Sequence, residues 1–343
     1  MPYIDRHRRR MPVTRKVCRM YARKFQICLA DTPYYHVVSR CVRRAWLWGR
    51  DEYAGRDYSH RKAWVLARMS ELTKLFAIDI CAYAVMSNHY HLVIRVNRSV
   101  AQAWDDAEVV TRWSALFDVP PLLGRWHRGE ASASECALAS EMIARWRDRL
   151  YDVSWFMRCM NEYLARRANA EDGCTGRFWE GRFRSQALLD EVGLLTAMAY
   201  VDLNPIRAGI SETPETSQFT SICERIRALR ATDSNATKPA LLPFRARNAG
   251  DRGIPYRLED YLQLVDWTGR TIRPGKPGSI DSCLPRIMDR LGIDARAWQN
   301  AMRPHGNVFG RAVGALSHLR LHASTLGQSW VRGLRQARQL YAR

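Results

Sequence analysis

Two histidines stand two residues apart in the apolar stretch MSNHYHLVIRV, residues 86–96. On a β-strand, residues i and i+2 point to the same face, so His89 and His91 should project side by side while Tyr90 points away. Two neighbouring imidazoles can share one metal ion, although a metal needs further ligands. The alternative is a structural pair of histidines, whose ring nitrogens form hydrogen bonds with the backbone or with water. The apolar residues that follow indicate a central strand, where unpaired polar groups are costly.

A second candidate lies in AYVDLNPIRAG, residues 199–209. Tyr200 and Asn204 are four residues apart, so on a helix they are neighbours on one face. A tyrosine can act as a nucleophile, but its phenol has a pKa of about 10 and needs a metal or a cationic environment. The amide oxygen of Asn204 could complete a metal site. Alone, Tyr200 would be interpreted as a packed aromatic; with the histidine pair and the charge of the chain, it indicates a nucleophile beside a metal.

The charge of the chain predicts a polyanionic partner. Lys and Arg number 54 against 34 Asp and Glu, a net charge of +20, and only six of the 54 are lysines, which leaves 48 arginines. Arginine makes forked contacts to phosphate and stacks on bases, so nucleic acid is the natural partner. A GC-rich genome could explain the preference for arginine over lysine but not the net charge.

The cysteines and the hydropathy pattern argue against other classes of protein. No two of the nine cysteines have the CxxC spacing of a zinc ribbon or finger. No apolar core of a signal peptide opens the sequence, and no apolar run approaches the ~18 residues of a spanning helix. We therefore expect a cytoplasmic, nucleoid-associated protein with reduced thiols and no membrane partner.

The elements that must position these residues follow a regular order. Alternating or apolar β-rich runs predict strands over 34–40, 78–86, 89–96 and 176–188. Helical spacing predicts helices over 58–77, 134–168 and 190–203, the last with Asp190 as N-cap. The order β-α-β-β-α-β is typical of a ferredoxin-like (RRM-like) α+β fold, an antiparallel sheet with helices on one face.

Composition divides the chain into four parts. Residues 1–30 form a basic arm, and 31–228 contain every candidate site residue. Residues 229–256 are rich in Pro, Gly, Asn and Asp and are predicted to be a linker. Residues 257–343 are predicted to be a mostly helical, basic C-terminal region, with seven arginines and no acid from residue 301 onward.

Four blocks together resemble the HUH single-tyrosine transposases, in particular the REP-associated tyrosine transposases. They span about residues 33–225 in the order YHVVSRCVRR (35–44), MSNHYHLVI (86–94), GRFWEGRFRSQ (176–186) and YVDLNPIRAG (200–209). The resemblance implies an enzyme that binds hairpin-forming single-stranded DNA and cleaves it through a 5′-phosphotyrosine intermediate. It implies Tyr200 as nucleophile and His89, His91 and Asn204 as ligands of a divalent ion, Mg²⁺ or Mn²⁺, for which imidazole and oxygen ligands are suitable.

Several basic or aromatic residues are candidates for DNA contacts around this site. Arg182 and Arg184 would share a strand face, Trp179 could stack on an unpaired base, and Arg207 could contact a phosphate. Arg43 and Arg44 follow the first strand. For each arginine, an exposed structural role is an equal alternative.

Other functions remain open on the sequence. A domesticated regulator that binds DNA hairpins without cleaving them would need the same charge, and a replication-initiator-type nickase would share the histidine motif. An RNA-binding module would leave the histidines unexplained. The oligomeric state, monomer or homodimer, is not determined by these motifs.

Overall fold

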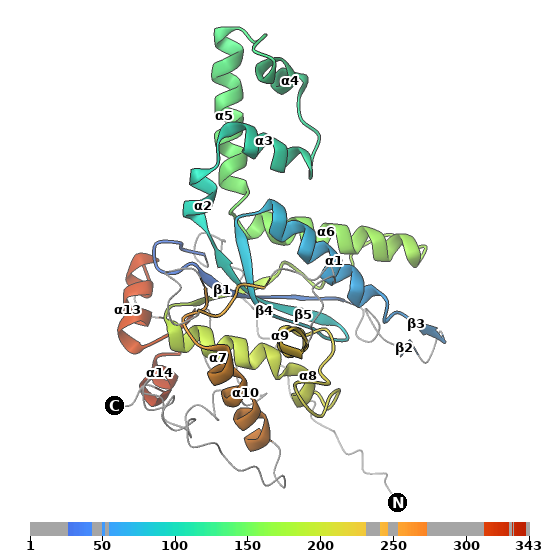
Figure 1. Cartoon of the computed structure of the whole chain (residues 1–343), viewed down its shortest axis with the longest axis vertical. Helices are drawn as coiled ribbons and strands as arrows, with labels where there is room; N and C mark the ends of the chain where they lie inside the picture. The colour runs from blue at the N-terminus through green and yellow to red at the C-terminus, as the bar shows by residue number, and fades with distance from the viewer. Residues whose placement is uncertain are drawn as a thin grey trace, which may run out of the picture.

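A computed structural model describes residues 27–42, 50–51, 55–230, 241–245, 253–272, 312–328, 331 and 333–340. Most of the predicted basic arm lies outside these ranges. Within them, a mixed five-stranded sheet has the order β4-β5-β1-β6-β7 (Figure 1). Its strands are β1 (Tyr34–Arg40), β4 (Ile78–Val85), β5 (His89–Val96), β6 (Arg184–Leu188) and β7 (Ala312–Val313), and β2 (Arg50–Asp51) pairs separately with β3 (Arg56–Asp57).

Helices make up most of the remaining described chain. They are α1 (Arg61–Leu75), α2 (Arg98–Ala103), α3 (Asp106–Ser114), α4 (Pro121–His127), α5 (Ala133–Arg149), α6 (Val153–Glu171), α7 (Glu191–Asp202), α8 (Asn204–Arg207), α9 (Ser221–Arg230), α10 (Leu258–Ile272), α13 (Leu316–Thr325) and α14 (Leu334–Leu340). The predicted helix over 134–168 is therefore two helices, α5 and α6. The side chain of Asp152 caps the second by accepting a hydrogen bond from the Trp155 amide.

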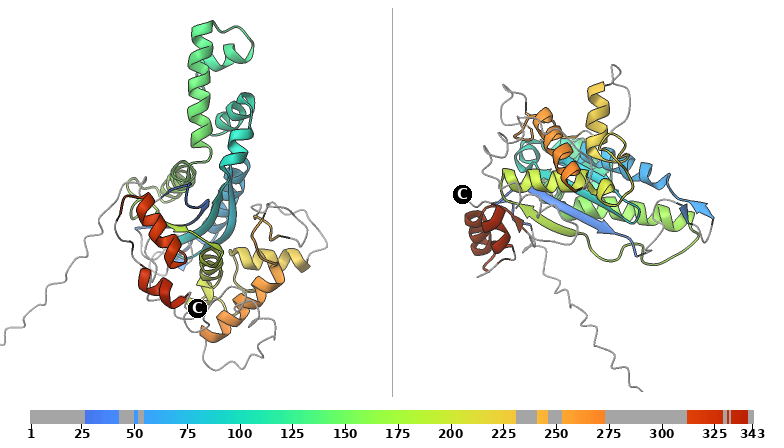
Figure 2. Two further views of the ribbon diagram at one scale, coloured as in Figure 1. Left: turned by 90° about the vertical axis from the view of Figure 1, so that its left-hand side faces the viewer. Right: turned by 90° about the horizontal axis from the view of Figure 1, so that it is seen from below.

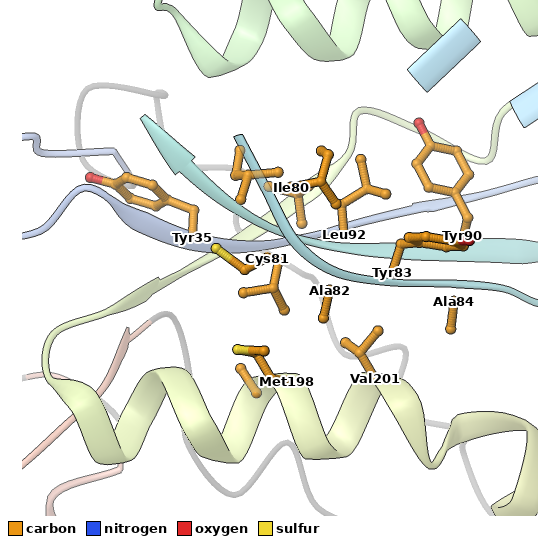
Figure 3. Packing of buried hydrophobic residues seen from close by; sticks show 14 of the residues in the cluster. Tyr35, Ile80, Cys81, Ala82, Tyr83, Ala84, Tyr90, Leu92, Met198 and Val201 are labelled. Carbon is orange, nitrogen blue, oxygen red and sulfur yellow. The ribbon is translucent and has the colours of Figure 1, made fainter. Parts of the chain in front are cut away.

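The α+β class is confirmed, but the expectation of helices on one face is wrong. Helices α1 and α6 cover the face to which Tyr90 points, while α7 covers the opposite face (Figure 1). Figure 3 shows Met198 and Val201 of α7 below the sheet, with Tyr90 and Leu92 above it. Every strand residue in the middle of β4 and β5 is consequently buried, because both faces are covered.

The sheet is also not wholly antiparallel. Strand β1 pairs antiparallel with β5 and β6, and β4 with β5, but β7 adds to β6 in parallel. The strand predicted over 176–188 is shorter, since only Arg184–Leu188 is regular and Trp179 forms a single bridge to Cys41. The finer ferredoxin-like assignment stays a prediction.

Helix α7 is fixed at its N-terminus by two separate contacts. Asp190 is its N-cap, as predicted, and accepts a 2.7 Å hydrogen bond from the Gly193 amide; its other oxygen accepts from Ala315 N at 2.6 Å. Gly193 packs against β7 so closely that a Cβ there would lie 2.8 Å from the Val313 carbonyl oxygen. The strand and the cap together determine how α7 lies across the sheet.

Helices α3, α4 and α5 project away from the sheet and surround a hydrophobic cluster of their own (Figures 1 and 2). Trp113 and Trp146 stack at its centre, with ring centroids 5.2 Å apart and planes 6° from parallel. Aromatic pairs of this kind add to the free energy of burial. This helical insertion, residues 105–150, is a small packed unit between β5 and α6.

Parts of the predicted linker pack on the core. Leu242 and Ile254 are buried, and the Leu242 amide donates to the Ile80 carbonyl at 2.8 Å. Helix α10 then contacts α7. The boundaries of the four predicted parts are not tested by these contacts. Among the described helices, none combines the length and apolar character needed to cross a membrane.

Candidate active site

The two histidines of β5 lie on the sheet face that α7 covers. Cα pairing sets His91 opposite Val38 and His89 opposite Arg40 on β1. Their ring centroids are 4.8 Å apart, as the two-residue spacing predicts. His91 is only 5% exposed, whereas His89 is half-buried at the strand end. The apolar residues after them form a central strand that fixes both rings.

Tyr200 and Asn204 meet these histidines from the end of α7. The Asn204 side-chain nitrogen lies 3.2 Å from Nε2 of His91, and the Tyr200 ring centroid lies 5.8 Å from that of His91. Asn204 begins α8, whose Pro205 is at a first-turn position where the missing N–H has no consequence. The structure thus brings together all four residues that the sequence placed in the site.

His36 of β1 belongs to the same cluster and was missed by the sequence prediction. Its Nε2 lies 2.9 Å from Nδ1 of His91, and the two rings stack with centroids 5.2 Å apart. Its ring is also 6.0 Å from that of Tyr200. The signal was present in YYHVVSR, where alternation puts His36 on the face opposite the buried Tyr35 and Val37.

The hydrogen bonds determine which ring nitrogen carries the proton. Since the Asn204 amide nitrogen donates to Nε2 of His91, Nδ1 of His91 carries a proton and donates to Nε2 of His36. Nδ1 of His89 lies 2.6 Å from the Asn88 side-chain oxygen and must donate to it. With the two amides oriented in this way, His89 and His91 both require the proton on Nδ1 and the lone pair on Nε2.

Burial keeps all three imidazoles neutral. It lowers the pKa of His36 to about 4 and that of His89 to about 4, the latter with help from the charge of Arg40. Burial also holds the pKa of His91 well below its usual value, and the neighbouring His36 and His89 add to this effect. Neutral imidazole is the form that binds a metal.

Arg207 also lies next to the Tyr200 ring. Its guanidinium carbon is 4.8 Å from the Tyr200 ring centroid, a cation–π distance. All three guanidinium nitrogens are buried, and among the residues that the structure describes none accepts a hydrogen bond from them. Burial lowers the pKa of Arg207 to about 10. A buried, unpaired cation next to Tyr200 is a place where an anion would be stabilised.

The remaining predicted contact residues lie in different surroundings. Arg184 begins β6 opposite Val38, on the face of the histidines, and is exposed, as is Arg182 before it. Trp179 lies on the other face, where its Nε1 donates to the Asn161 carbonyl at 2.8 Å and its ring meets Tyr90 edge-on. Arg43 and Arg44 lie outside the described residues.

The side chains present have donor atoms that suit a divalent ion, although the described residues contain no group of three His, Cys, Asp or Glu that could hold one. The donor set is two imidazole Nε2 atoms and one amide. In the structure the amide nitrogen of Asn204 faces Nε2 of His91. Rotation of that amide by 180° would present its oxygen instead, next to the lone pair of His91. Nitrogen and oxygen ligands of this kind fit Mg²⁺ or Mn²⁺.

Comparison with known proteins adds one similarity. No protein-family model and no curated protein sequence matches the chain. A solved structure of a REP-associated tyrosine transposase bound to a REP hairpin is similar at 11% identity, over 66% of this chain and 93% of that one, with a TM-score of 0.35. At that TM-score the likeness carries no weight for function, which is therefore inferred from the site itself.

Proposed function

We propose that the chain is an HUH-type tyrosine transposase, an endonuclease and strand transferase that acts on hairpin-forming single-stranded DNA. The observation that carries this proposal is the position of Tyr200 next to both the neutral His91 ring and the guanidinium of Arg207, from which no described residue accepts a hydrogen bond. A phenol in such a place would have both a metal-ligand set and a phosphate-binding cation within reach. Neither surrounding is expected for a tyrosine that only packs.

The reaction is a displacement at phosphorus. The phenol oxygen of Tyr200 forms a bond to a backbone phosphorus and loses its proton to solvent. The bond from that phosphorus to the 3′ oxygen breaks, and the 3′ oxygen takes a proton and leaves as a hydroxyl. The product is a 5′-phosphotyrosine, and attack by another 3′-hydroxyl reverses the step, so rejoining needs no ATP.

His89, His91 and Asn204 would hold the divalent ion, Mg²⁺ or Mn²⁺. A bound ion supplies Lewis-acid stabilisation of the charge that builds on the phosphate oxygens. Arg207 would donate hydrogen bonds to the same phosphate, since no residue in the described part of the chain accepts from its nitrogens. Arg184, exposed on the same sheet face, would contact the DNA strand outside the site.

The test is the formation of a covalent protein–DNA adduct. The full chain is incubated with a labelled hairpin oligonucleotide carrying single-stranded flanks, with Mn²⁺, and separated under denaturing conditions. We expect an adduct that is absent in Tyr200→Phe and present in the control Tyr163→Phe, whose hydroxyl lies on α6 and accepts from Arg167. Adduct formation by Tyr200→Phe would refute the assignment.

The same experiment separates the alternatives. A domesticated regulator would bind the hairpin in a filter or mobility assay, with or without metal, and form no adduct. A replication-initiator-type nickase would form the adduct on unstructured single strands as readily as on the hairpin.

A further inference from the structure

His36 is joined to the candidate ligand His91 by a chain of hydrogen bonds that crosses three strands. Nδ1 of His91 donates to Nε2 of His36 at 2.9 Å. The other nitrogen of His36 is then protonated, and a side-chain hydrogen bond joins His36 to Gln186 of β6. Gln186 lies directly opposite His36 in the β1–β6 register, so the strand pairing itself places the two together.

The direction of this chain of hydrogen bonds follows from its Asn204 end. At one end the Asn204 amide nitrogen contacts Nε2 of His91. Since Nε2 of His36 then accepts from His91, the proton of the neutral His36 ring is on Nδ1, and the Gln186 side chain ends the chain of hydrogen bonds. Each ring in between is left with one tautomer. His36 is not itself a ligand in this arrangement, because its Nε2 is occupied by His91.

We propose that Gln186 and His36 form a positioning relay that holds the His91 ring in the tautomer and orientation needed to bind a metal through Nε2. This inference rests on the proposed function, since it concerns the same metal site. Partners of this kind orient metal-binding histidines by accepting the proton of the other ring nitrogen. For His89 a single residue has this role, because the side-chain oxygen of neighbouring Asn88 accepts the Nδ1 proton directly.

Three variants of the full chain test the relay. His36→Leu removes the acceptor for His91. His36→Gln is the conservative variant, because its amide oxygen can reach about where Nε2 of His36 lies. His322→Leu is the control, since His322 is also a hydrogen-bonded histidine away from the surface but bonds to Asp31, outside the site. The readouts are the ring tautomer of His91, from long-range ¹H–¹⁵N correlations, and the affinity for Mn²⁺ alone, from electron paramagnetic resonance.

We expect wild-type His91 to carry its proton on Nδ1. In His36→Leu that single tautomer should be lost and the Mn²⁺ affinity should fall about 10–100-fold. His36→Gln should recover most of both, and His322→Leu should change neither. A folded His36→Leu with the wild-type tautomer and the wild-type Mn²⁺ affinity would overturn the relay.

The two readouts keep this inference separate from the proposed function. If the wild type bound no Mn²⁺ and formed no DNA adduct, the proposed function would fail, and the tautomer of His91 would still decide whether the relay exists. If His36→Leu did not fold, Gln186→Leu takes its place, because it keeps His36 but removes the acceptor for Nδ1. Unchanged His36 and His91 tautomers in that variant would also overturn the relay.

Discussion

At the scale of single residues, Tyr200 has neighbours that differ in charge and in hydrogen-bonding capacity. Neutral His36 and His91 lie on one side, and the cation of Arg207 lies over its ring. Asn204, four residues on, contacts Nε2 of His91. Histidines that stay neutral can bind a metal, and an arginine that stays charged can bind a phosphate. Neutral imidazoles and a cation next to the same phenol support the proposed phosphoryl transfer.

The first residue-scale prediction concerns the ligands. In His89→Ala and His91→Ala, DNA cleavage in Mn²⁺ should fall at least ~100-fold, because Lewis-acid stabilisation at phosphate contributes several kcal/mol. Hairpin binding should be largely spared, since most affinity comes from phosphate contacts elsewhere. The two quantities are measured by adduct formation and by fluorescence anisotropy. Equal losses of cleavage and binding would contradict a ligand role.

A second prediction concerns Arg207, whose replacement should lower the rate of DNA cleavage but raise the stability of the free protein. Arg207→Leu should lower the rate of adduct formation about 10–100-fold, because one hydrogen bond to a charged group contributes about 1.5–3 kcal/mol. The free protein should at the same time melt at a higher temperature, since an unpaired buried guanidinium is destabilising.

Arg207→Lys is the control for this prediction. It keeps the charge but loses the forked geometry, so the adduct rate should be partly restored. A lower melting temperature in Arg207→Leu with an unchanged adduct rate would mean that Arg207 is a structural residue.

The sequence predicted four of the site residues but not the way they are supported. His89 and His91 follow from strand periodicity, and Tyr200 with Asn204 from helical spacing. His36 lies 53 positions before His89 in the numbering, and only the pairing of β1 with β5 brings it to His91. Trp179 was predicted from its place near Arg182, but its indole faces α6, where Asn161 accepts its proton.

At the scale of elements, the site depends on how α7 crosses the sheet. The helix is capped by Asp190 beside β7 at its start and by Leu203, directly before Asn204, at its end. Its C-terminal end is held by Asp202, which is buried and accepts from Ser221 Oγ at 2.5 Å and Tyr261 OH at 2.5 Å. These bonds join α7 to α9 and α10, so the end that presents Tyr200 is supported from both neighbours.

The substitution Gly193→Ala tests how the N-terminal end of α7 packs against β7. Gly193→Ala would place a Cβ 2.8 Å from the Val313 carbonyl oxygen, which the backbone cannot avoid without moving β7 or α7. Overpacking of this kind costs about 1–3 kcal/mol, so the denaturant midpoint should fall. Gly181→Ala is the matched control, because nothing lies within 4 Å of its Cβ position. Equal stability of the two variants would show that α7 and β7 are not packed as described.

The elements that the sequence predicted well are those with local signals. Alternating or apolar runs predicted strands β1, β4 and β5, and the two-residue turn predicted the pairing of β4 with β5. One aspartate, Asp190, predicted the start of α7. The face that α7 covers could not be predicted, because almost every residue of α7 is buried and no polar stripe marks its orientation. Strand β7 is two residues long and pairs with β6, which lies over a hundred positions earlier in the sequence. No local sequence pattern predicts such a strand.

At the scale of the whole molecule, positive charge is unevenly distributed. The helical insertion, residues 105–150, has six arginines against eight aspartates and glutamates, a net charge of −2 in a chain of +20. Several of these arginines are paired within the insertion, among them Arg125 with Glu135 and Arg128 with Glu130. The insertion is therefore a poor polyanion-binding surface, and the basic charge lies in the rest of the chain.

Charge-reversal variants of two arginines, one on the sheet and one in the insertion, test where the DNA-binding positive charge lies. Arg184→Glu, at the exposed start of β6, should weaken hairpin binding and lower the slope of log affinity against log salt by about 1 or more, because phosphate contacts release counterions. Arg128→Glu in the insertion, where the arginine is also exposed, should leave both the affinity and its salt dependence nearly unchanged. A larger effect from the insertion would place the DNA there.

The central claim is that Tyr200 forms the covalent bond to DNA, and one measurement addresses it directly. Wild-type protein is trapped with a suicide hairpin oligonucleotide in Mn²⁺, digested with nuclease and protease, and the modified peptide is sequenced by tandem mass spectrometry. We predict a 5′-phosphonucleotide on Tyr200, within the segment that also contains Asn204 and Arg207. A nucleotide on any other residue, or abundant cleavage with no modified peptide, would contradict the account.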